Sequence, residues 1–257
     1  MFDRLLSLFG RKPKTRNVDS HSHETTTHVI IIDGTMSSLM PGCETNAGLT
    51  YKMLRDTADR HLSVYYEAGI QWRDWRSSLD VLMGRGINRQ IKRAYGVLAG
   101  RYRPGDKIFL IGYSRGAYAV RSLAGIIDYV GLLQAENATV RNIRQIYRLY
   151  QSTPYSKAAT EFKAAYCHAD VQIEAIGVWD TVKALGLRLP VFWRWADQKH
   201  GFHNHVLGRH IRNGFHALAL DENRVAYKPV IWQSREGWEG QLKQIWLRGL
   251  HKDIGGQ

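Results

Sequence analysis

Short apolar runs recur along the chain, and longer amphipathic stretches separate them. Four runs are typical of buried strands, because they are short, continuous and rich in branched side chains. They lie at 29–32, 108–111, 172–180 and 244–251. Between the second and third runs, Ala117, Val120, Leu123, Ala124 and Ile127 recur at helical spacing. This alternation predicts an α/β fold in three layers, with a mostly parallel central sheet and helices on both faces.

The sequence Gly-Tyr-Ser-Arg-Gly at 112–116 stands between a predicted strand and a predicted helix. A strand that stops abruptly, one strained residue and an immediate helix would lift the Ser114 hydroxyl clear of the sheet edge. Glycines at 112 and 116 leave room for strand and helix to close on each other. Ser114 is therefore the candidate nucleophile. An ordinary glycine-rich turn is the alternative, because the pattern alone is common by chance.

A nucleophilic serine needs a base and an acid that orients the base, and here they should follow in the order serine, acid, histidine at strand ends. Asp180 ends the third predicted strand and His251 ends the fourth. Taken singly, Asp180 also fits a helix N-cap, and His251 fits a surface or core histidine. Asp253 and Asp170 are rival acids. Asp180 ranks first because it lies at a strand end.

Ester or amide hydrolysis by a serine also needs backbone N–H donors for the oxyanion. One expected donor is the amide of Arg115, the residue after the candidate nucleophile. The second is the amide of Thr35 or Met36 in the loop after the first strand, where Gly34 lets the backbone approach a substrate closely. A plain tight turn is the alternative for this loop.

The motifs IIIDGT, GYSRGAY, GVWDTV and HKDIGG, with HALALDENR at 216–224, resemble an α/β-hydrolase family without characterised function. That family shares the catalytic domain of type VI secretion phospholipase effectors (Tle1-like), and the resemblance spans about residues 28–256. It implies an α/β-hydrolase fold and ester hydrolysis, with Ser114 as nucleophile, Asp180 as acid and His251 as base. It implies no particular substrate, since the phospholipid-cleaving effectors are one branch of a larger group.

Two parts are expected along the chain. Residues 1–27 form a basic, flexible segment, and residues 28–257 form the catalytic domain. In the resembled family another helix would follow, so this domain is expected to be truncated at its C-terminal end. The first fourteen residues set apolar side chains beside basic ones, which would suit a short interfacial anchor. A frayed or disordered start is the alternative.

Composition fits one globular catalytic domain. The chain has 257 residues with 44% hydrophobic and 23% charged. No stretch reaches the roughly 18 apolar residues of a membrane span. The two cysteines, Cys43 and Cys167, argue against a disulfide scaffold and favour a cytoplasmic location. The proposed chemistry requires no cofactor.

The formal net charge of +13 raises a second class of function, a catalytically silent basic protein that binds an anionic membrane or nucleic acid. Arg141, Arg144 and Arg148 lie at helical spacing and are expected to share one helix face. The other basic residues are spread along the chain without a nucleic-acid signature, which argues against nucleic acid. Peripheral contact with anionic membrane stays an alternative to a plain solvated face.

Residues 200–216 contain five of the eleven histidines: His200, His203, His205, His210 and His216. Neighbouring cysteines and carboxylates that would complete a ligand set are missing, so no metal site is expected. Trp193 and Trp195, which follow Asp180 in the chain, suit a lid, an acyl pocket or simple loop packing.

The segment at 217–225 is expected to be helical, because its apolar residues recur at helical spacing. These residues are Ala217, Leu218, Leu220 and Val225. Asp221, Glu222 and Arg224 lie close enough in the chain for a local charge network. The motif is interpreted as a structural brace for the loop that carries Asp180.

Together these observations predict a serine hydrolase that cleaves a carboxylic ester, with lipid or phospholipid as the candidate substrate, through an acyl-enzyme. A peptidase or thioesterase on the same fold is the enzymatic alternative, because triad chemistry does not select the leaving group.

Overall fold

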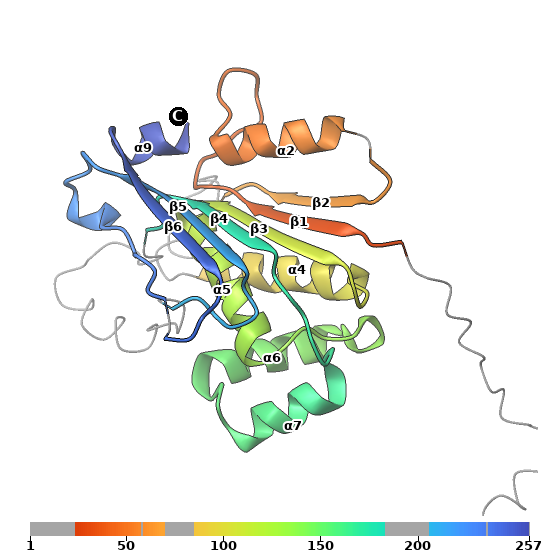
Figure 1. Ribbon diagram of the computed structural model, residues 1–257. Coiled ribbons are helices and arrows are strands. Elements are labelled where there is room, and N and C mark those ends of the chain that lie inside the picture. Colours follow the sequence, from red (N-terminus) through yellow and green to blue (C-terminus); the bar gives the residue numbers. More distant parts are fainter. Residues whose placement is uncertain (1–23, 58, 70–84, 183–205, 235, 257) are drawn as a thin grey trace, which may run out of the picture.

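In the computed structural model, six strands form one central sheet (Figure 1). The structure describes residues 24–57, 59–69, 85–182, 206–234 and 236–256. The strands are β1 Thr27–Ile32, β2 Leu62–Glu67, β3 Lys107–Tyr113, β4 Ala175–Trp179, β5 Asn213–Ala219 and β6 Gln241–Leu247. Their order in the sheet is β2-β1-β3-β4-β5-β6, and each neighbouring pair is parallel. The prediction of an α/β fold around a mostly parallel sheet is confirmed.

Helices cover both faces of this sheet (Figure 1). On one face lie α2 (Asn46–Asp56) and α9 (His251–Gly255). On the other lie α4 (Arg85–Arg101), α5 (Arg115–Tyr129), α6 (Val140–Ser152) and α7 (Lys157–Tyr166). Two short 3₁₀ turns, Ala135–Asn137 and Val225–Tyr227, lie in the connections. The predicted three-layer arrangement is therefore confirmed.

The alternation of side chains along β1 explains why both faces need a cover. Ile30 and Ile32 pack into the large core that β1 shares with α4 and α5. Val29 and Ile31 point to the opposite face and pack beside Ala47 of α2. Because successive strand residues face opposite sides, a strand that is apolar throughout must be buried on both.

The sheet has a switch point between β1 and β3. From β1 the chain adds β2 on one side of β1 and then returns to add β3 on the other. In open parallel sheets, the crevice outside the carboxyl ends of the strands at such a point is the usual place for a ligand. The loops that begin at residues 33 and 114 both start there.

The prediction of a helix at 217–225 is wrong. Residues Asn213–Ala219 form β5, which pairs with β4 and β6, and Val225–Tyr227 form only a 3₁₀ turn. A short apolar run fits a buried strand and a helix equally well by spacing alone. Pairing with two neighbouring strands decides between them.

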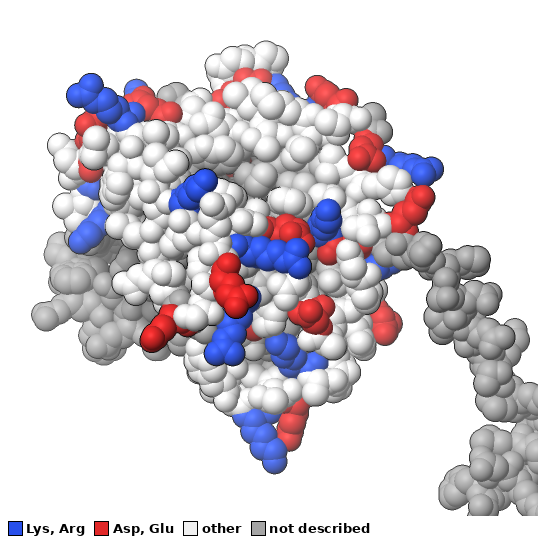
Figure 2. Space-filling view, in the orientation of Figure 1, with Lys and Arg blue, Asp and Glu red and all other residues white. Residues whose placement is uncertain are grey.

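The arginine stripe is exposed on α6, as expected for Arg141, Arg144 and Arg148. Helix α6 packs on the C-terminal half of α5, where Tyr150 lies against Gly125. The stripe is thus at the end of α5 that points away from Ser114 (Figure 1). On the face shown in Figure 2, Lys and Arg side chains are interspersed with Asp and Glu. Among the described helices, none combines the length and apolarity that a membrane crossing requires.

Gly116→Ala is expected to destabilise the fold. A Cβ at this position would lie 2.1 Å from the Ile32 carbonyl oxygen, so backbone must move and the free energy of unfolding should fall by about 1–3 kcal/mol. Gly100→Ala in α4 is the control, because nothing lies within 4 Å of its Cβ position and alanine should stabilise that helix by about 0.5–1 kcal/mol. Urea denaturation measures both. Equal stability of Gly116→Ala and the wild type would contradict the close packing described here.

Candidate active site

Ser114 stands in a sharp turn between β3 and α5. It occupies the N-cap position of α5 with φ 55° and ψ −120°, but its hydroxyl does not cap the helix. A Cβ on Gly112 would lie 2.7 Å from Ala117 Cα, and one on Gly116 would lie 2.1 Å from Ile32 O. Both positions flanking the serine therefore require glycine, for the steric reason that the sequence suggests.

The imidazole of His251 lies between Ser114 and Asp180. Its Nε2 is 2.8 Å from Ser114 Oγ, and its Nδ1 is 2.6 Å from Asp180 Oδ2. The three residues are buried, with 8%, 5% and 1% exposure for Ser114, His251 and Asp180. The carboxylate selects the tautomer in which Nδ1–H donates to Asp180, which leaves Nε2 free to accept from the serine hydroxyl. The structure thus brings together three predicted residues that are far apart in sequence.

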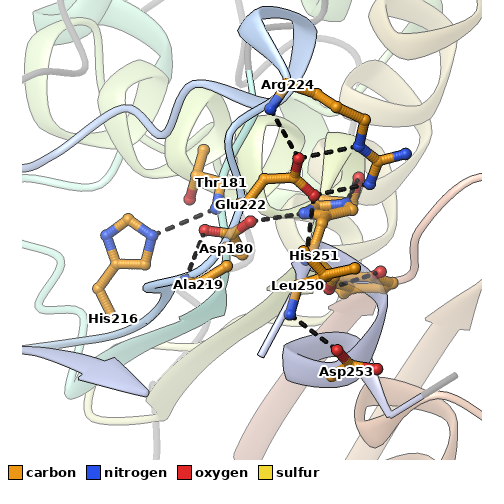
Figure 3. Close-up of polar contacts among 11 residues, drawn as sticks. Asp180, Thr181, His216, Ala219, Glu222, Arg224, Leu250, His251 and Asp253 are labelled. Carbon is orange, nitrogen blue, oxygen red and sulfur yellow. Dashed lines mark hydrogen bonds and ion pairs between the residues drawn. The ribbon is translucent and has the colours of Figure 1, made fainter. Parts of the chain in front are cut away.

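Asp180 is itself held from a second direction. Its Oδ1 accepts a hydrogen bond from the Ala219 amide at 3.2 Å, as Figure 3 shows. Its own amide donates to the Ala217 carbonyl at 2.8 Å. The end of β5 therefore orients the carboxylate toward His251.

Backbone strain is concentrated at this site. Within the described ranges, the non-glycine residues with positive φ are Met36 at 63°, Ser114 at 55° and Asp180 at 35°. Each follows a different strand, β1, β3 or β4. Such conformations cost about 1–3 kcal/mol each and persist where the surrounding structure enforces them, often at functional sites.

The loop after β1 is organised by the buried carboxylate of Asp33. It accepts hydrogen bonds from the Thr45 hydroxyl at 2.7 Å, the Tyr66 hydroxyl at 2.8 Å and the Gly34 amide at 2.6 Å. Burial raises the pKa of Asp33, and these hydrogen bonds partly oppose that rise. The carboxylate therefore anchors the loop to α2 and β2 at once.

This loop borders the turn at Ser114. A Cβ on Gly34 would lie 2.5 Å from the ring of Tyr113, the residue before Ser114. The predicted oxyanion donors are the amides of Arg115, Thr35 and Met36, and no hydrogen bond within the described structure engages them. The hydroxyl of Thr35 is also buried without a partner among these residues. Free donors are thus present on both sides of the turn.

Two tyrosines that the sequence analysis did not single out pack on the imidazole of His251. The ring of Tyr113 stacks on the His251 imidazole with centroids 5.1 Å apart, and its hydroxyl donates to the His251 carbonyl at 3.2 Å. Tyr227 packs at 4.7 Å and 50°. Burial raises the pKa of Tyr113, so its phenol stays neutral. The position of Tyr113 inside the GYSRG motif, directly before Ser114, was the sequence feature that could have indicated a place at this site.

The rival acids do not contact the imidazole. Asp253 Oδ2 accepts the amide of Leu250 at 2.7 Å, as Figure 3 shows. Asp170 accepts from the side chain of Gln172 at 3.1 Å on the surface. Neither replaces Asp180 in this arrangement.

The histidines of the 200–216 segment that the structure describes have separate partners. His210 Nδ1 lies 2.8 Å from Asp128 Oδ1. His216 Nε2 accepts the amide of Thr181 at 3.2 Å, and burial together with the nearby Arg121 lowers the pKa of His216 to about 4. Among the residues described, no three His, Cys, Asp or Glu side chains converge as metal ligands.

Several predicted features lie outside the described residues. They are most of the N-terminal segment, His200, His203, His205, Trp193 and Trp195.

Comparison with known proteins gives a family match over most of the chain. Residues 26–257 match the family described as "T6SS, Phospholipase effector Tle1-like, catalytic domain". Among curated proteins, the uncharacterised protein YEL023C of Saccharomyces cerevisiae is 28% identical over 240 residues, which covers 84% of this chain and 34% of the yeast protein.

Two solved structures are similar at low identity. One is the Tle1 effector bound to the VgrG spike of the type 6 secretion system, with TM-score 0.45, 17% identity, and coverage of 90% of this chain and 51% of that one. The other is an uncharacterised protein from Pseudomonas aeruginosa, with TM-score 0.49, 15% identity, and coverage of 98% and 43%. The chain spans about a third of the yeast relative and about half of each solved chain.

The strain at Ser114 can be measured by comparing two variants that both lack the hydroxyl. Ser114→Gly is expected to be more stable than Ser114→Ala by about 1 kcal/mol, because glycine adopts positive φ without strain. Ala164→Gly on the exposed face of α7 is the control, where the same exchange should cost about 1 kcal/mol. Urea denaturation gives the differences. If Ser114→Gly is the less stable of the pair, the turn is not strained.

Proposed function

The chain belongs to the family of Tle1-like phospholipase effector catalytic domains, and we propose that it is a serine hydrolase that cleaves a carboxylic ester of a lipid. The observation that carries the proposal is the hydrogen-bonded chain from Ser114 through His251 to Asp180, at 2.8 Å and 2.6 Å. These distances match those expected between a nucleophile, its base and the group that orients the base.

In the proposed first half-reaction, Ser114 Oγ attacks the ester carbonyl carbon. His251 Nε2 takes the hydroxyl proton and then gives it to the leaving alkoxide, so that an acyl-serine and an alcohol result. Asp180 holds Nδ1–H and stabilises the imidazolium while it exists. In the second half, His251 Nε2 takes a proton from water as the water oxygen attacks the acyl carbon. The bond from that carbon to Ser114 Oγ then breaks, and His251 returns the proton to Oγ, which releases the carboxylic acid and regenerates Ser114.

The negative oxygen of each tetrahedral intermediate would be held by the Arg115 amide together with the amide of Thr35 or Met36. Arg115 begins α5, so its N–H has no acceptor within the helix. The loop after β1 lies against this helix start, since the Ile32 carbonyl abuts Gly116. Donors from two elements would thus converge beside Ser114.

Lipid is the substrate class that the family description supports. A peptidase or thioesterase would use the same residues, and the substrate decides among them. A catalytically silent basic binding protein has less support, because its best feature is the Arg141, Arg144 and Arg148 face, which lies at the opposite end of α5 from Ser114. Such a protein would also have no use for a strained serine hydrogen-bonded to a histidine.

Ser114→Ala is expected to abolish covalent labelling by a fluorophosphonate probe and to reduce hydrolysis of p-nitrophenyl butyrate by about 10⁴-fold or more. Ser152→Ala is the matched control, because Ser152 lies at the end of α6 and its hydroxyl donates to the Arg148 carbonyl. The control should label like the wild type. Retention of wild-type esterase activity in Ser114→Ala would refute the nucleophile assignment.

Asp180→Asn is expected to lower kcat by about 10⁴-fold, because an amide in place of the carboxylate favours the wrong histidine tautomer. Asp170→Asn should leave kcat unchanged, and Asp253→Asn should cost far less than Asp180→Asn. Steady-state kinetics with p-nitrophenyl butyrate compare the three. If the largest loss occurs in Asp253→Asn, the acid belongs to the loop beside His251.

A further inference from the structure

The loop that carries His251 is held by three carboxylates. Three successive amides each donate to one carboxylate: Gly249 N–H donates to Asp221 Oδ2 at 2.7 Å, Leu250 N–H to Asp253 Oδ2 at 2.7 Å, and His251 N–H to Glu222 Oε2 at 3.3 Å. Two of these carboxylates, Asp221 and Glu222, come from the segment after β5, which the sequence motif suggested as a brace for the loop of Asp180. The segment after β5 therefore holds the loop of His251, while Ala217 and Ala219 at the end of β5 hold Asp180.

The loop needs such partners because of its place in the fold. β6 ends at Leu247 and α9 begins at His251, so the amides between them belong to neither element. Unpaired backbone donors are costly, and side-chain carboxylates are strong acceptors for them. Gly249 has φ 120°, which also commits this turn to a glycine.

Glu222 differs from the other two carboxylates because its side chain is buried and Arg224 stabilises its negative charge. Its side chain is 2% exposed. Arg224 donates to it from its backbone amide at 2.9 Å, from Nε at 2.8 Å and from Nη2 at 2.6 Å. The hydrogen bonds from Arg224 lower the pKa of Glu222 to about 2. The acceptor on the His251 amide is thus a permanent carboxylate in a fixed orientation.

Arg224 reaches His251 by a second route. Its guanidinium lies over the ring of Tyr227 at 4.1 Å, and that ring packs on the imidazole at 4.7 Å. The pair therefore contacts the backbone of His251 through Glu222 and the ring of His251 through Tyr227. Figure 3 shows Glu222 between Arg224 and His251.

We infer that the Glu222–Arg224 pair is a positioning device for the general base, which sets the location of His251 Nε2 relative to Ser114 Oγ. The inference rests on the proposed function and assigns new residues to it. Loss of the Glu222 charge leaves the His251 amide with a weaker acceptor and releases Arg224 from its place over Tyr227. The imidazole then shifts, and a displacement of about 1 Å can cost about 10²-fold in rate.

Glu222→Gln in the full chain is the test, with p-nitrophenyl butyrate as substrate. The expected result is a kcat lowered by about 10–100-fold with KM within about twofold, because the pair contacts the base and not the nucleophile. Arg224→Gln should behave like Glu222→Gln, and Arg224→Lys should recover part of the rate since it restores a cationic donor. The control is Glu174→Gln, which breaks the Arg212–Glu174 pair at 3.0 Å near the opposite ends of the strands and should leave kcat unchanged.

A fluorophosphonate titration separates positioning from general loss of structure. Positioning predicts slower labelling that still reaches the wild-type stoichiometry. A reduced labelled fraction, matched by the loss of kcat, would mean that the pair only supports the fold and would overturn the inference, as would a wild-type kcat in Glu222→Gln.

Proton NMR gives a readout that does not depend on turnover. The far-downfield resonance of His251 Nδ1–H in its hydrogen bond to Asp180 should shift or broaden in Glu222→Gln and stay unchanged in Glu174→Gln. An unchanged resonance in Glu222→Gln overturns the inference. If the wild type shows no Ser114-dependent hydrolysis, the proposed function fails by itself, while this resonance still reports whether Glu222 positions the imidazole.

Discussion

Close backbone packing at the Ser114 turn joins the core of the sheet to the candidate site. The last carbonyl of β1 abuts Gly116, and Gly112 abuts the first turn of α5, so three segments meet without room for a single side-chain carbon. Helix α5 is buried from Gly116 to Ile127. Burial of that apolar surface, at roughly 25 cal/mol per Å², is the force that holds the turn closed against its strain.

The parallel order of the strands brings residues from separate loops together at the candidate site. Because all strands run the same way, the loops after β1, β3 and β4 all begin at the carboxyl ends of the strands. Each loop carries one of the strained residues Met36, Ser114 and Asp180. Packed helices on both faces resist relaxation of that strain. The strained positions are therefore those of the proposed nucleophile, the proposed acid and one proposed oxyanion donor.

His251 is held in a different way, because it follows β6 at the edge of the sheet. None of the seven residues of β6 is buried, so packing there is weaker than at β1 or β3. Ion-assisted hydrogen bonds take over the role of packing, through Asp221, Glu222 and Asp253, and aromatic rings enclose the imidazole. The positions of Ser114 and Asp180 thus depend on packing against the core, whereas the position of His251 depends on polar and aromatic contacts.

The strands that precede Ser114 and Asp180 could be predicted from the sequence, as could the glycines near the serine, because those features depend on local spacing and local sterics. The strand at 213–219 could not be predicted in this way, since pairing with β4 and β6 overrides an ambiguous apolar pattern. The contacts of His216 and Glu222 could not be predicted either. Their partners lie 35 and 29 residues away in the chain. No local pattern encodes such contacts, because they form only when the carboxyl ends of separate strands come together in the folded sheet.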